Sequence, residues 1–238
     1  MTHQPERATE GQGQGAGAGG GSGRRLLIVP RWAGRPESDY YPWLLTRLAA
    51  EHPGLFAEAR VLVLPRPELP DVDAWPAAIA AALQPPGQDA AALEQTYVLA
   101  HSVGCQALLR ALRGLAPGPG GAGASMGASG GASGGASGGG AIGGALCVAG
   151  WWQIDRPWDS IRPWLEPMAD LERARAAVRT LRVLLSDNDP FTADHVGNAE
   201  RWQQLGAGVR LAPGGRHFNN AEEPAVLAAL LELVGATP

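Results

Sequence analysis

Short apolar runs, separated by polar, proline-rich or glycine-rich segments, recur along most of this chain. The first run, at residues 25–30, is almost continuously apolar, which is typical of a strand buried on both faces of a parallel sheet. Further runs predict strands over 60–64, 97–100, 145–150, 180–185 and 208–211. Helical patterns lie between them, over 40–51, 73–83, 107–113, 192–205 and 222–234, and a further one follows Pro167. This alternation predicts an α/β fold with a mostly parallel sheet of about six strands and helices on both faces.

Two stretches interrupt the alternation. Residues 1–23 are polar and then rich in Gly and Ala, and residues 114–144 consist almost entirely of Gly, Ala, Ser and Pro. Neither composition can bury enough apolar surface to fold alone. We therefore predict a disordered Gly-rich tail at 1–23 and one domain at 24–236, with a low-complexity insertion at about 114–144.

Composition and charge narrow the choice of partners. The 238 residues suffice for one domain with a sizeable core, and a net charge of −4 offers no basic surface to nucleic acid. No apolar run approaches bilayer length, and the first residues carry no apolar signal segment. Cys105 and Cys147 do not make a disulfide framework. The expectation is a cytoplasmic protein that binds neither nucleic acid nor membrane.

The stretch from Tyr97 to Gln106 carries the strongest chemical signal. An apolar strand runs directly into a helix, and Ser102 lies in the turn with Ala100 and Gly104 two positions to either side. This is the pattern of a nucleophile elbow, G-x-S-x-G, with Ala in place of the first Gly. Such a turn holds the serine hydroxyl at the C-terminal edge of a sheet, at the positive end of a helix. Ser102 is therefore the candidate nucleophile.

A serine nucleophile needs a base and a carboxylate that orients the base. In hydrolases of this type the partners follow the serine in the order acid, then histidine. Asp187 and Asp189 both follow the strand at 180–185, and His217 follows the strand at 208–211. All three would reach the edge of the sheet where Ser102 emerges. Spacing alone leaves both aspartates as candidates for the acid.

Other residues at this edge have candidate roles in binding. The backbone N–H of Val103 and one N–H from Arg31 or Trp32 would form an oxyanion hole. Trp151 and Trp152 could form the wall of an apolar substrate site, or could simply cover the sheet. His101, as the strand neighbour of Ser102, points the other way, which favours a structural role. No spacing typical of metal ligands is present.

Three motifs together resemble the retinoblastoma-binding protein 9 / YdeN-type serine hydrolases. They are His-Ser-Val-Gly-Cys at 101–105, Ser-Asp-Asn-Asp-Pro-Phe at 186–191 and Gly-Arg-His-Phe-Asn-Asn at 215–220, supported by Tyr-Tyr-Pro-Trp at 40–43 and Leu-Pro-Asp at 69–71. The resemblance spans roughly residues 25–235 without the insertion. It implies a compact α/β-hydrolase fold with a minimal lid and no cofactor. It also implies that the acid is the aspartate before Pro-Phe, Asp189, which leaves Asp187 as second choice.

The chain departs from the pattern of this family at two points of the site. Ala100 replaces the usual Gly, and Arg31 and Trp32 stand where many members carry Gly after Pro. The second departure bears on the oxyanion hole, because Gly lets the backbone approach a substrate closely.

These features predict a serine hydrolase that cleaves a small or medium acyl ester, or an amide, through a Ser-His-Asp triad and an acyl-enzyme. The segment 156–178, where larger hydrolases insert a lid, is short, which favours an open site or a small substrate. Two alternatives remain. One is a non-catalytic protein-interaction module on a hydrolase fold, and the other is an acyltransferase that uses the same acyl-enzyme. The pattern identifies no protein partner.

Overall fold

The computed structural model describes residues 23–87, 89–115 and 140–237. Nearly all of the predicted tail at 1–23, and the predicted insertion apart from its ends, lie outside these residues. The strands are β1 (Arg25–Val29), β2 (Glu58–Val61), β3 (Thr96–His101), β4 (Ile142–Val148), β5 (Val178–Leu185) and β6 (Gly208–Leu211). They form one sheet in the order β2-β1-β3-β4-β5-β6, and every neighbouring pair is parallel. The predicted sheet of about six strands is confirmed.

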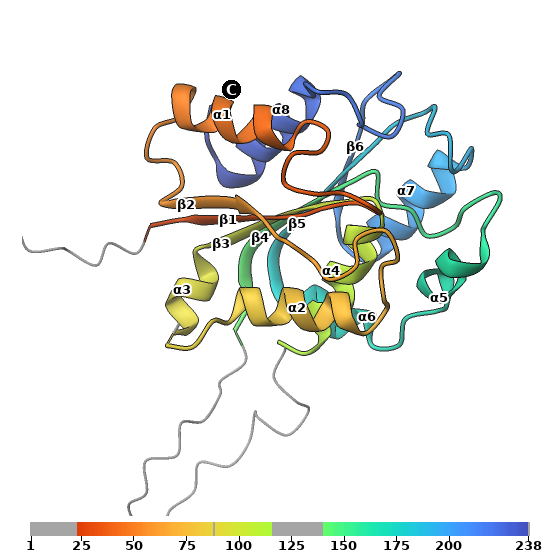
Figure 1. The fold of residues 1–238 in the computed structure, drawn as a ribbon, viewed down its shortest axis with the longest axis horizontal. Coiled ribbons are helices and arrows are strands. Elements are labelled where there is room, and N and C mark those ends of the chain that lie inside the picture. Colours follow the sequence, from red (N-terminus) through yellow and green to blue (C-terminus); the bar gives the residue numbers. More distant parts are fainter. Residues whose placement is uncertain (1–22, 88, 116–139, 238) are drawn as a thin grey trace, which may run out of the picture.

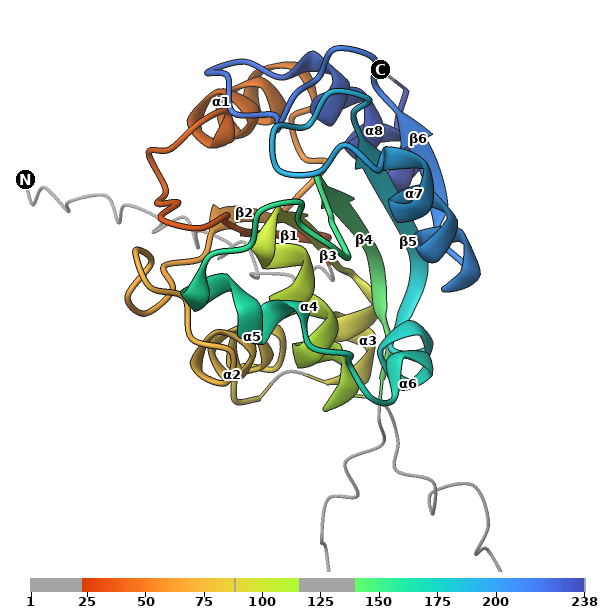
Figure 2. The same cartoon turned by 90° about the vertical axis from the view of Figure 1, so that its right-hand side faces the viewer.

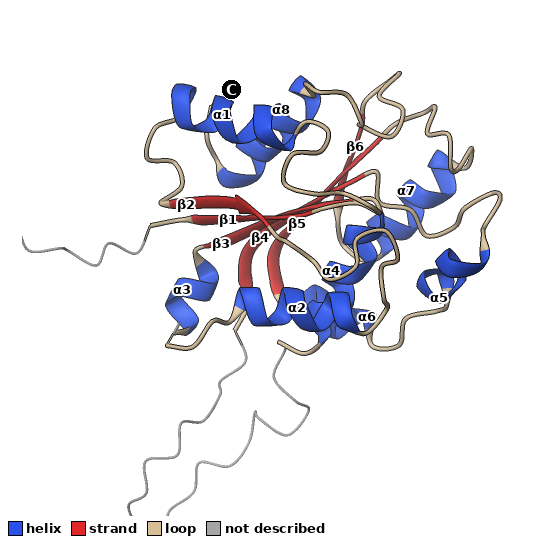
Figure 3. Cartoon of the chain, in the orientation of Figure 1, coloured by secondary structure: helices blue, strands red, loops and turns tan. Residues whose placement is uncertain are grey.

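Helices cover both faces of this sheet (Figures 1 and 3). They are α1 (Tyr41–Glu51), α2 (Ala74–Leu83), α3 (Ala90–Glu94), α4 (Val103–Arg113), α5 (Arg162–Leu165), α6 (Leu171–Ala176), α7 (His195–Gln204) and α8 (Pro224–Val234), with a 3₁₀ turn η1 at Asp159–Ile161. Helices α1 and α8 pack on one face, and α2, α4 and α6 pack on the other (Figure 1). The sequence did not predict α3, η1 and α5, because these elements are too short to show a helical period.

The apolar runs are continuous because both faces of the sheet are covered. In β1, Leu27 and Val29 belong to the core beneath α2 and α4, whereas Leu26 and Ile28 belong to the core beneath α1 and α8. All four side chains are fully buried. Successive side chains of a strand point to opposite faces, so a strand between two helical layers needs apolar residues at every position.

Strand β2 ends earlier than its apolar pattern predicts. The sequence predicted residues 60–64, but the strand covers Glu58–Val61. Its partner β1 is followed by Pro30, which has no N–H with which to continue the ladder. Leu62 and Leu64 are still buried while Val63 is 81% exposed, so the apolar pattern beyond Val61 reflects packing and not strand pairing.

Strand β4 begins earlier than predicted, at Ile142 rather than Ala145. The last residues assigned to the low-complexity insertion therefore belong to the sheet, where Ile142 pairs with Val178. Gly143 packs tightly, because a Cβ there would lie 2.4 Å from the carbonyl oxygen of Glu94. Local composition could not separate such a close-packed glycine from a linker glycine, because the contact is made with a distant segment.

The carboxyl ends of the parallel strands meet along one edge of the sheet, which lies on the side that faces the viewer in Figure 2. At this edge the chain turns from β3 into α4 with Ser102 between them, in a conformation with φ of 57°. The predicted elbow is therefore present. Gly104 makes the turn possible, because a Cβ there would lie 2.7 Å from the carbonyl oxygen of Pro30 and 2.9 Å from that of Val29.

We expect Gly104→Ala to destabilise the protein by about 1–3 kcal/mol, because the added methyl group would push β1 and α4 apart. Urea unfolding followed by circular dichroism measures this change. Gly114→Ala is the matched control, since its Cβ would meet its nearest neighbour, the carbonyl oxygen of Ala111, at an ordinary 3.4 Å. Equal stability of the two variants would contradict the steric account of the elbow.

Candidate active site

Ser102 lies buried at the centre of the carboxyl edge of the sheet. Its backbone N–H donates to the carbonyl oxygen of Val148 at 2.9 Å, which ties the turn to strand β4. Its Oγ lies 2.9 Å from Nε2 of His217 and 3.4 Å from the indole Nε1 of Trp151. The hydroxyl therefore has a basic nitrogen on one side and a weak N–H donor on the other.

His217 reaches Ser102 from the loop after β6 and is itself held by Asp189, from the loop after β5. The Nδ1 of His217 lies 2.7 Å from Oδ2 of Asp189, and both side chains are almost fully buried. Because a carboxylate oxygen accepts, Nδ1 carries the proton and Nε2 is free to accept the proton of Ser102. The other oxygen of Asp189 accepts from the backbone N–H of Phe191 at 2.9 Å, which fixes the carboxylate.

Asp187, the other candidate acid, lies in the same loop but does not reach His217. Its Oδ1 accepts from the backbone N–H of Gly214 at 2.8 Å. Asn188 accepts from the backbone N–H of Arg216 at 2.7 Å, and the hydroxyl of Ser186 donates to the carbonyl oxygen of Arg216. This polar run therefore braces the loop that carries His217. The sequence showed the run as a motif, but the role of Ser186 and Asn188 was missed because their partners lie about thirty residues away.

The backbone on both sides of His217 is strained. Arg216 and Phe218 both have a φ of 52°, a region that residues with a Cβ seldom adopt. Strain of this kind persists where surrounding contacts over-determine the conformation, and it gathers at functional sites. Phe218 is fully buried, and the ring of Phe191 contacts the imidazole of His217 with centroids 4.6 Å apart. Packing and the bracing bonds together hold the imidazole in place.

The two predicted oxyanion donors on the loop after β1 are not equivalent. The backbone N–H of Arg31 donates to the hydroxyl of Tyr41 at 3.1 Å, so it is already in use. Within the described residues, no hydrogen-bond acceptor meets the backbone N–H of Trp32 or that of Val103. Both residues line the cavity that contains Ser102. The geometry therefore favours Val103 and Trp32 as a pair of donors for an oxyanion.

The cavity above Ser102 has a volume of about 320 Å³. The side chains of Ser102 and His217 form part of its wall. The larger apolar side chains of the wall are those of Trp32, Trp151, Ile154, Trp158, Ile161 and Phe191. Trp158 bridges two loops, since its ring lies 5.5 Å from that of Trp32, edge to face, and 6.2 Å from that of Phe191. The sequence missed Ile154, Trp158 and Ile161, because nothing local marks which side of the segment after β4 faces the serine.

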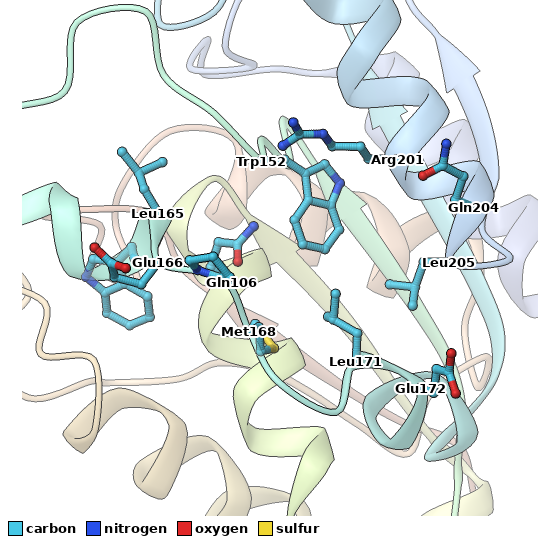
Figure 4. Close-up of a pocket in the computed structure, with 12 residues that line it drawn as sticks. Gln106, Trp152, Leu165, Glu166, Met168, Leu171, Glu172, Arg201, Gln204 and Leu205 are labelled. Atoms are coloured by element: carbon cyan, nitrogen blue, oxygen red, sulfur yellow. The ribbon is translucent and has the colours of Figure 1, made fainter.

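Of the two predicted substrate-binding tryptophans, the structure brings Trp151 to the cavity but not Trp152. The backbone N–H of Trp152 donates to Oδ1 of Asn198 at 2.6 Å, and its ring packs 4.8 Å from that of Trp202. Trp152 lines a separate cavity of about 500 Å³, together with Gln106, Met168 and other residues (Figure 4). Both residues follow the end of β4 at Val148, and their rings pack against different parts of the fold.

His101 lies buried behind the elbow. Its Nδ1 is 2.9 Å from the hydroxyl of Tyr41, and its Nε2 is 2.8 Å from the carbonyl oxygen of His217. Burial, and secondarily the neighbouring His217, holds the pKa of His101 well below its usual value of 6.5. The imidazole of His101 is therefore neutral at physiological pH.

Neither cysteine side chain is in a reactive state. Cys105 and Cys147 are both buried free thiols, and burial raises the pKa of Cys105, which disfavours its reactive thiolate form. Among the described residues, no group of three or more His, Cys, Asp or Glu side chains is placed to hold a metal ion. None of the helices that the structure describes is both long and apolar enough to cross a membrane.

Comparison with known proteins bears on the fold. No protein-family model matches the chain, and no curated protein matches it by sequence. Among solved structures, the ydeN gene product from B. subtilis is similar over 89% of this chain and 99% of that chain, with a TM-score of 0.67 and 21% identity. Est1E from Butyrivibrio proteoclasticus covers 90% of this chain and 89% of its own, with a TM-score of 0.57 and 11% identity.

The RedJ thioesterase from Streptomyces coelicolor is also similar, over 90% of each chain, with a TM-score of 0.50 and 17% identity. A putative hydrolase of the alpha/beta superfamily from Xanthomonas campestris matches 90% of this chain and 98% of its own, with a TM-score of 0.52 and 13% identity. The chain therefore has the α/β-hydrolase fold. This agrees with the fold that the motifs predicted, and the ydeN product stands among the similar structures.

We expect the neutral, buried state of His101 to make stability depend on pH. Unfolding restores the ordinary pKa of His101, near 6.5. Below that pH the unfolded chain therefore binds a proton at His101, whereas the folded chain does not. The free energy of unfolding should therefore be constant above pH 6.5 and fall below it, by at most about 1.4 kcal/mol per pH unit from this group.

Urea unfolding of the wild type and of His101→Gln at pH 7.5 and pH 5 measures this contribution, since the difference between the two proteins removes the other titrating groups. A difference in stability that does not change with pH would show that His101 is protonated equally in both states.

Proposed function

We propose that this chain, which has the α/β-hydrolase fold, is a serine hydrolase in which Ser102, His217 and Asp189 form the catalytic triad. The observation that carries the proposal is the continuous hydrogen-bonded line from Ser102 Oγ through His217 to Asp189, with distances of 2.9 and 2.7 Å. A protein that only binds a partner has no need for this buried, strained arrangement. The putative hydrolase and the thioesterase with similar structures lend further support.

In the first half of the proposed reaction, Ser102 Oγ attacks the carbonyl carbon of an ester while its proton passes to Nε2 of His217. Asp189 keeps the imidazole in the required tautomer and stabilises the imidazolium that forms. The carbonyl oxygen becomes an oxyanion, which accepts from the backbone N–H groups of Val103 and Trp32. A donor of this kind contributes about 3–4 kcal/mol to stabilising the transition state.

The tetrahedral intermediate then collapses, and the bond to the leaving alcohol breaks. His217 gives its proton to the departing oxygen and the acyl group stays on Ser102. In the second half, His217 takes a proton from water as the water attacks the acyl carbon. Collapse of the second intermediate releases the acid and returns the proton to Ser102.

The proposed substrate is an ester with a small or medium apolar acyl group. The cavity at Ser102, about 320 Å³, lies at the lower end of the range of about 300–1,000 Å³ for ligand sites. Its wall is mostly aromatic and branched aliphatic, and Arg31, the charged residue on its rim, is paired with Asp39 at 2.7 Å. An apolar acyl group matches this wall better than a charged one.

A fluorophosphonate probe, which reacts with activated serines, tests the proposed triad. We expect the wild type to label, and Ser102→Ala and His217→Ala to lose labelling. Asp189→Asn should slow labelling by about 10³- to 10⁴-fold because the imidazole would take the wrong tautomer. Asp187→Asn is the matched control and should keep the labelling rate within about tenfold, since the Asn oxygen can still accept from the backbone N–H of Gly214.

Other outcomes discriminate between the alternatives. A folded wild type that does not label would favour an interaction module. Equal losses in the two aspartate variants would mean that the loop, and not one carboxylate, is what catalysis needs. Labelling accompanied by transfer to added alcohols in preference to water would favour an acyltransferase.

Trp158 should determine the preference for acyl length. Trp158→Ala removes ring contacts with Trp32 and Phe191 and one wall of the cavity. We expect kcat/KM for p-nitrophenyl hexanoate to fall by about 3- to 10-fold, given about 0.5–1.5 kcal/mol for an aromatic contact. The acetate ester carries the shortest acyl chain, so we expect its kcat/KM to stay near the wild-type value, and it serves as the internal control. Equal losses of kcat/KM for both esters would show that the acyl group does not lie against Trp158.

A further inference from the structure

A buried chain of hydrogen bonds behind the elbow joins the two loops that flank Ser102. It begins at the backbone N–H of Arg31, which donates to the hydroxyl of Tyr41 at 3.1 Å. It continues from the Tyr41 hydroxyl to Nδ1 of His101 at 2.9 Å, and from Nε2 of His101 to the carbonyl oxygen of His217 at 2.8 Å. Its two ends are therefore the loop of the proposed oxyanion hole and the loop of the proposed base.

The donors and acceptors of this chain admit one arrangement. The carbonyl oxygen of His217 can only accept, so Nε2 of His101 carries the proton and Nδ1 is the acceptor. The Tyr41 hydroxyl therefore donates to Nδ1 of His101 and accepts from the N–H of Arg31. Every polar atom in the chain is satisfied, and a change at one member leaves a buried partner without a bond.

The surroundings give this chain little room to move. His101, Tyr40 and Tyr41 are fully buried, and their rings contact one another with centroids 4.9–6.0 Å apart. The ring of His101 also lies 5.5 Å from the imidazole of His217. Charged groups near the chain are engaged elsewhere, since Arg31 pairs with Asp39, and Glu223 accepts from Asn220.

Each end of this chain of hydrogen bonds lies next to a group that takes part in the proposed reaction. The peptide after Arg31 carries the N–H of Trp32, one of the two cavity N–H groups that meet no acceptor among the described residues. The carbonyl at the other end belongs to His217, whose imidazole lies 2.9 Å from Ser102 Oγ. His101 and Ser102 are neighbours in the chain, so the residue before the nucleophile faces away from the substrate and holds both flanking loops.

We propose that His101 and Tyr41 are positioning residues, which set the distance between the oxyanion donor at Trp32 and the base at His217 through this hydrogen-bonded chain. The inference rests on the proposed hydrolase function for its effect on rate, but the chain itself can be tested without turnover. Their contribution is made in the transition state, when both the oxyanion and the imidazolium must be stabilised at once.

Tyr41→Phe is the decisive variant, because it removes one hydroxyl and leaves the ring that packs in the core. We expect kcat and kcat/KM for p-nitrophenyl butyrate to fall together by about 10- to 100-fold, as a small misplacement of reacting groups allows. The backbone amide of Arg31 should also lose hydrogen-exchange protection by about tenfold, because its acceptor is gone.

Tyr40→Phe is the matched control. Tyr40 is the adjacent, equally buried tyrosine, and its hydroxyl has no hydrogen-bond partner among the described residues. This variant should keep the wild-type kcat, KM and Arg31 protection. A second variant, His101→Asn, has a side chain too short to span from Tyr41 to the carbonyl of His217, and it should lower kcat without a change in KM.

The outcomes separate the two proposals. If the wild type hydrolyses the ester and Tyr41→Phe does so at the same rate, the positioning role is wrong and the proposed function stands. If the wild type neither hydrolyses esters nor labels, the proposed function is wrong, and Arg31 protection then decides whether the chain of bonds exists. Equal protection of Arg31 in the wild type, Tyr40→Phe and Tyr41→Phe would overturn the inference whatever the activity.

Discussion

The turn between β3 and α4 is the constraint on which the rest of the site depends. Ser102 adopts a φ of 57°, which costs about 1–3 kcal/mol for a residue with a Cβ. The bond from its N–H to Val148 and the close approach of Gly104 to the carbonyl of Pro30 hold it there. Because the sheet and the buried helix α4 fix both ends of the turn, the position of the hydroxyl follows from the backbone and needs no mobile loop.

Around this fixed serine, polar contacts between loops replace the apolar packing that holds the sheet. The segment from Ser186 to Asp189 makes four separate contacts with the loop at 214–217, three of them to backbone groups. His217 stands between two residues in the left-handed region, which a loop without such bracing would relax. In the proposed triad, a base held in this way needs little reorganisation when charge develops, which is the main means by which preorganised sites lower a barrier.

The tryptophans show how little residue type reveals about location in the fold. Trp151 lies beside the hydroxyl of Ser102, while its neighbour Trp152 packs on Trp202 and lines another cavity. Trp158 comes from the short segment after β4, yet it contacts Trp32 and so narrows the cavity over the serine. The sequence favoured an open site or a small substrate, and the structure shows an apolar cavity whose wall is built by five chain segments together.

The sequence by itself predicted the order of the six strands and of the longer helices, the elbow at Ser102 and the candidate base His217. These follow from apolar periodicity and from the steric needs of one sharp turn, both of which are local. Only the tertiary structure shows that Asp189 and not Asp187 contacts His217, that the N–H of Arg31 is already bonded, and that Trp151 and not Trp152 lines the cavity at Ser102. It also places the glycines at 143–144 in a strand. For the site residues the relevant contacts lie between ten and forty-six residues apart in the chain: Tyr41 engages Arg31, Gly214 engages Asp187, and Asn198 engages Trp152. Hydrogen bonds of this kind leave no periodic pattern in the sequence, because each joins a single donor atom to a single acceptor atom.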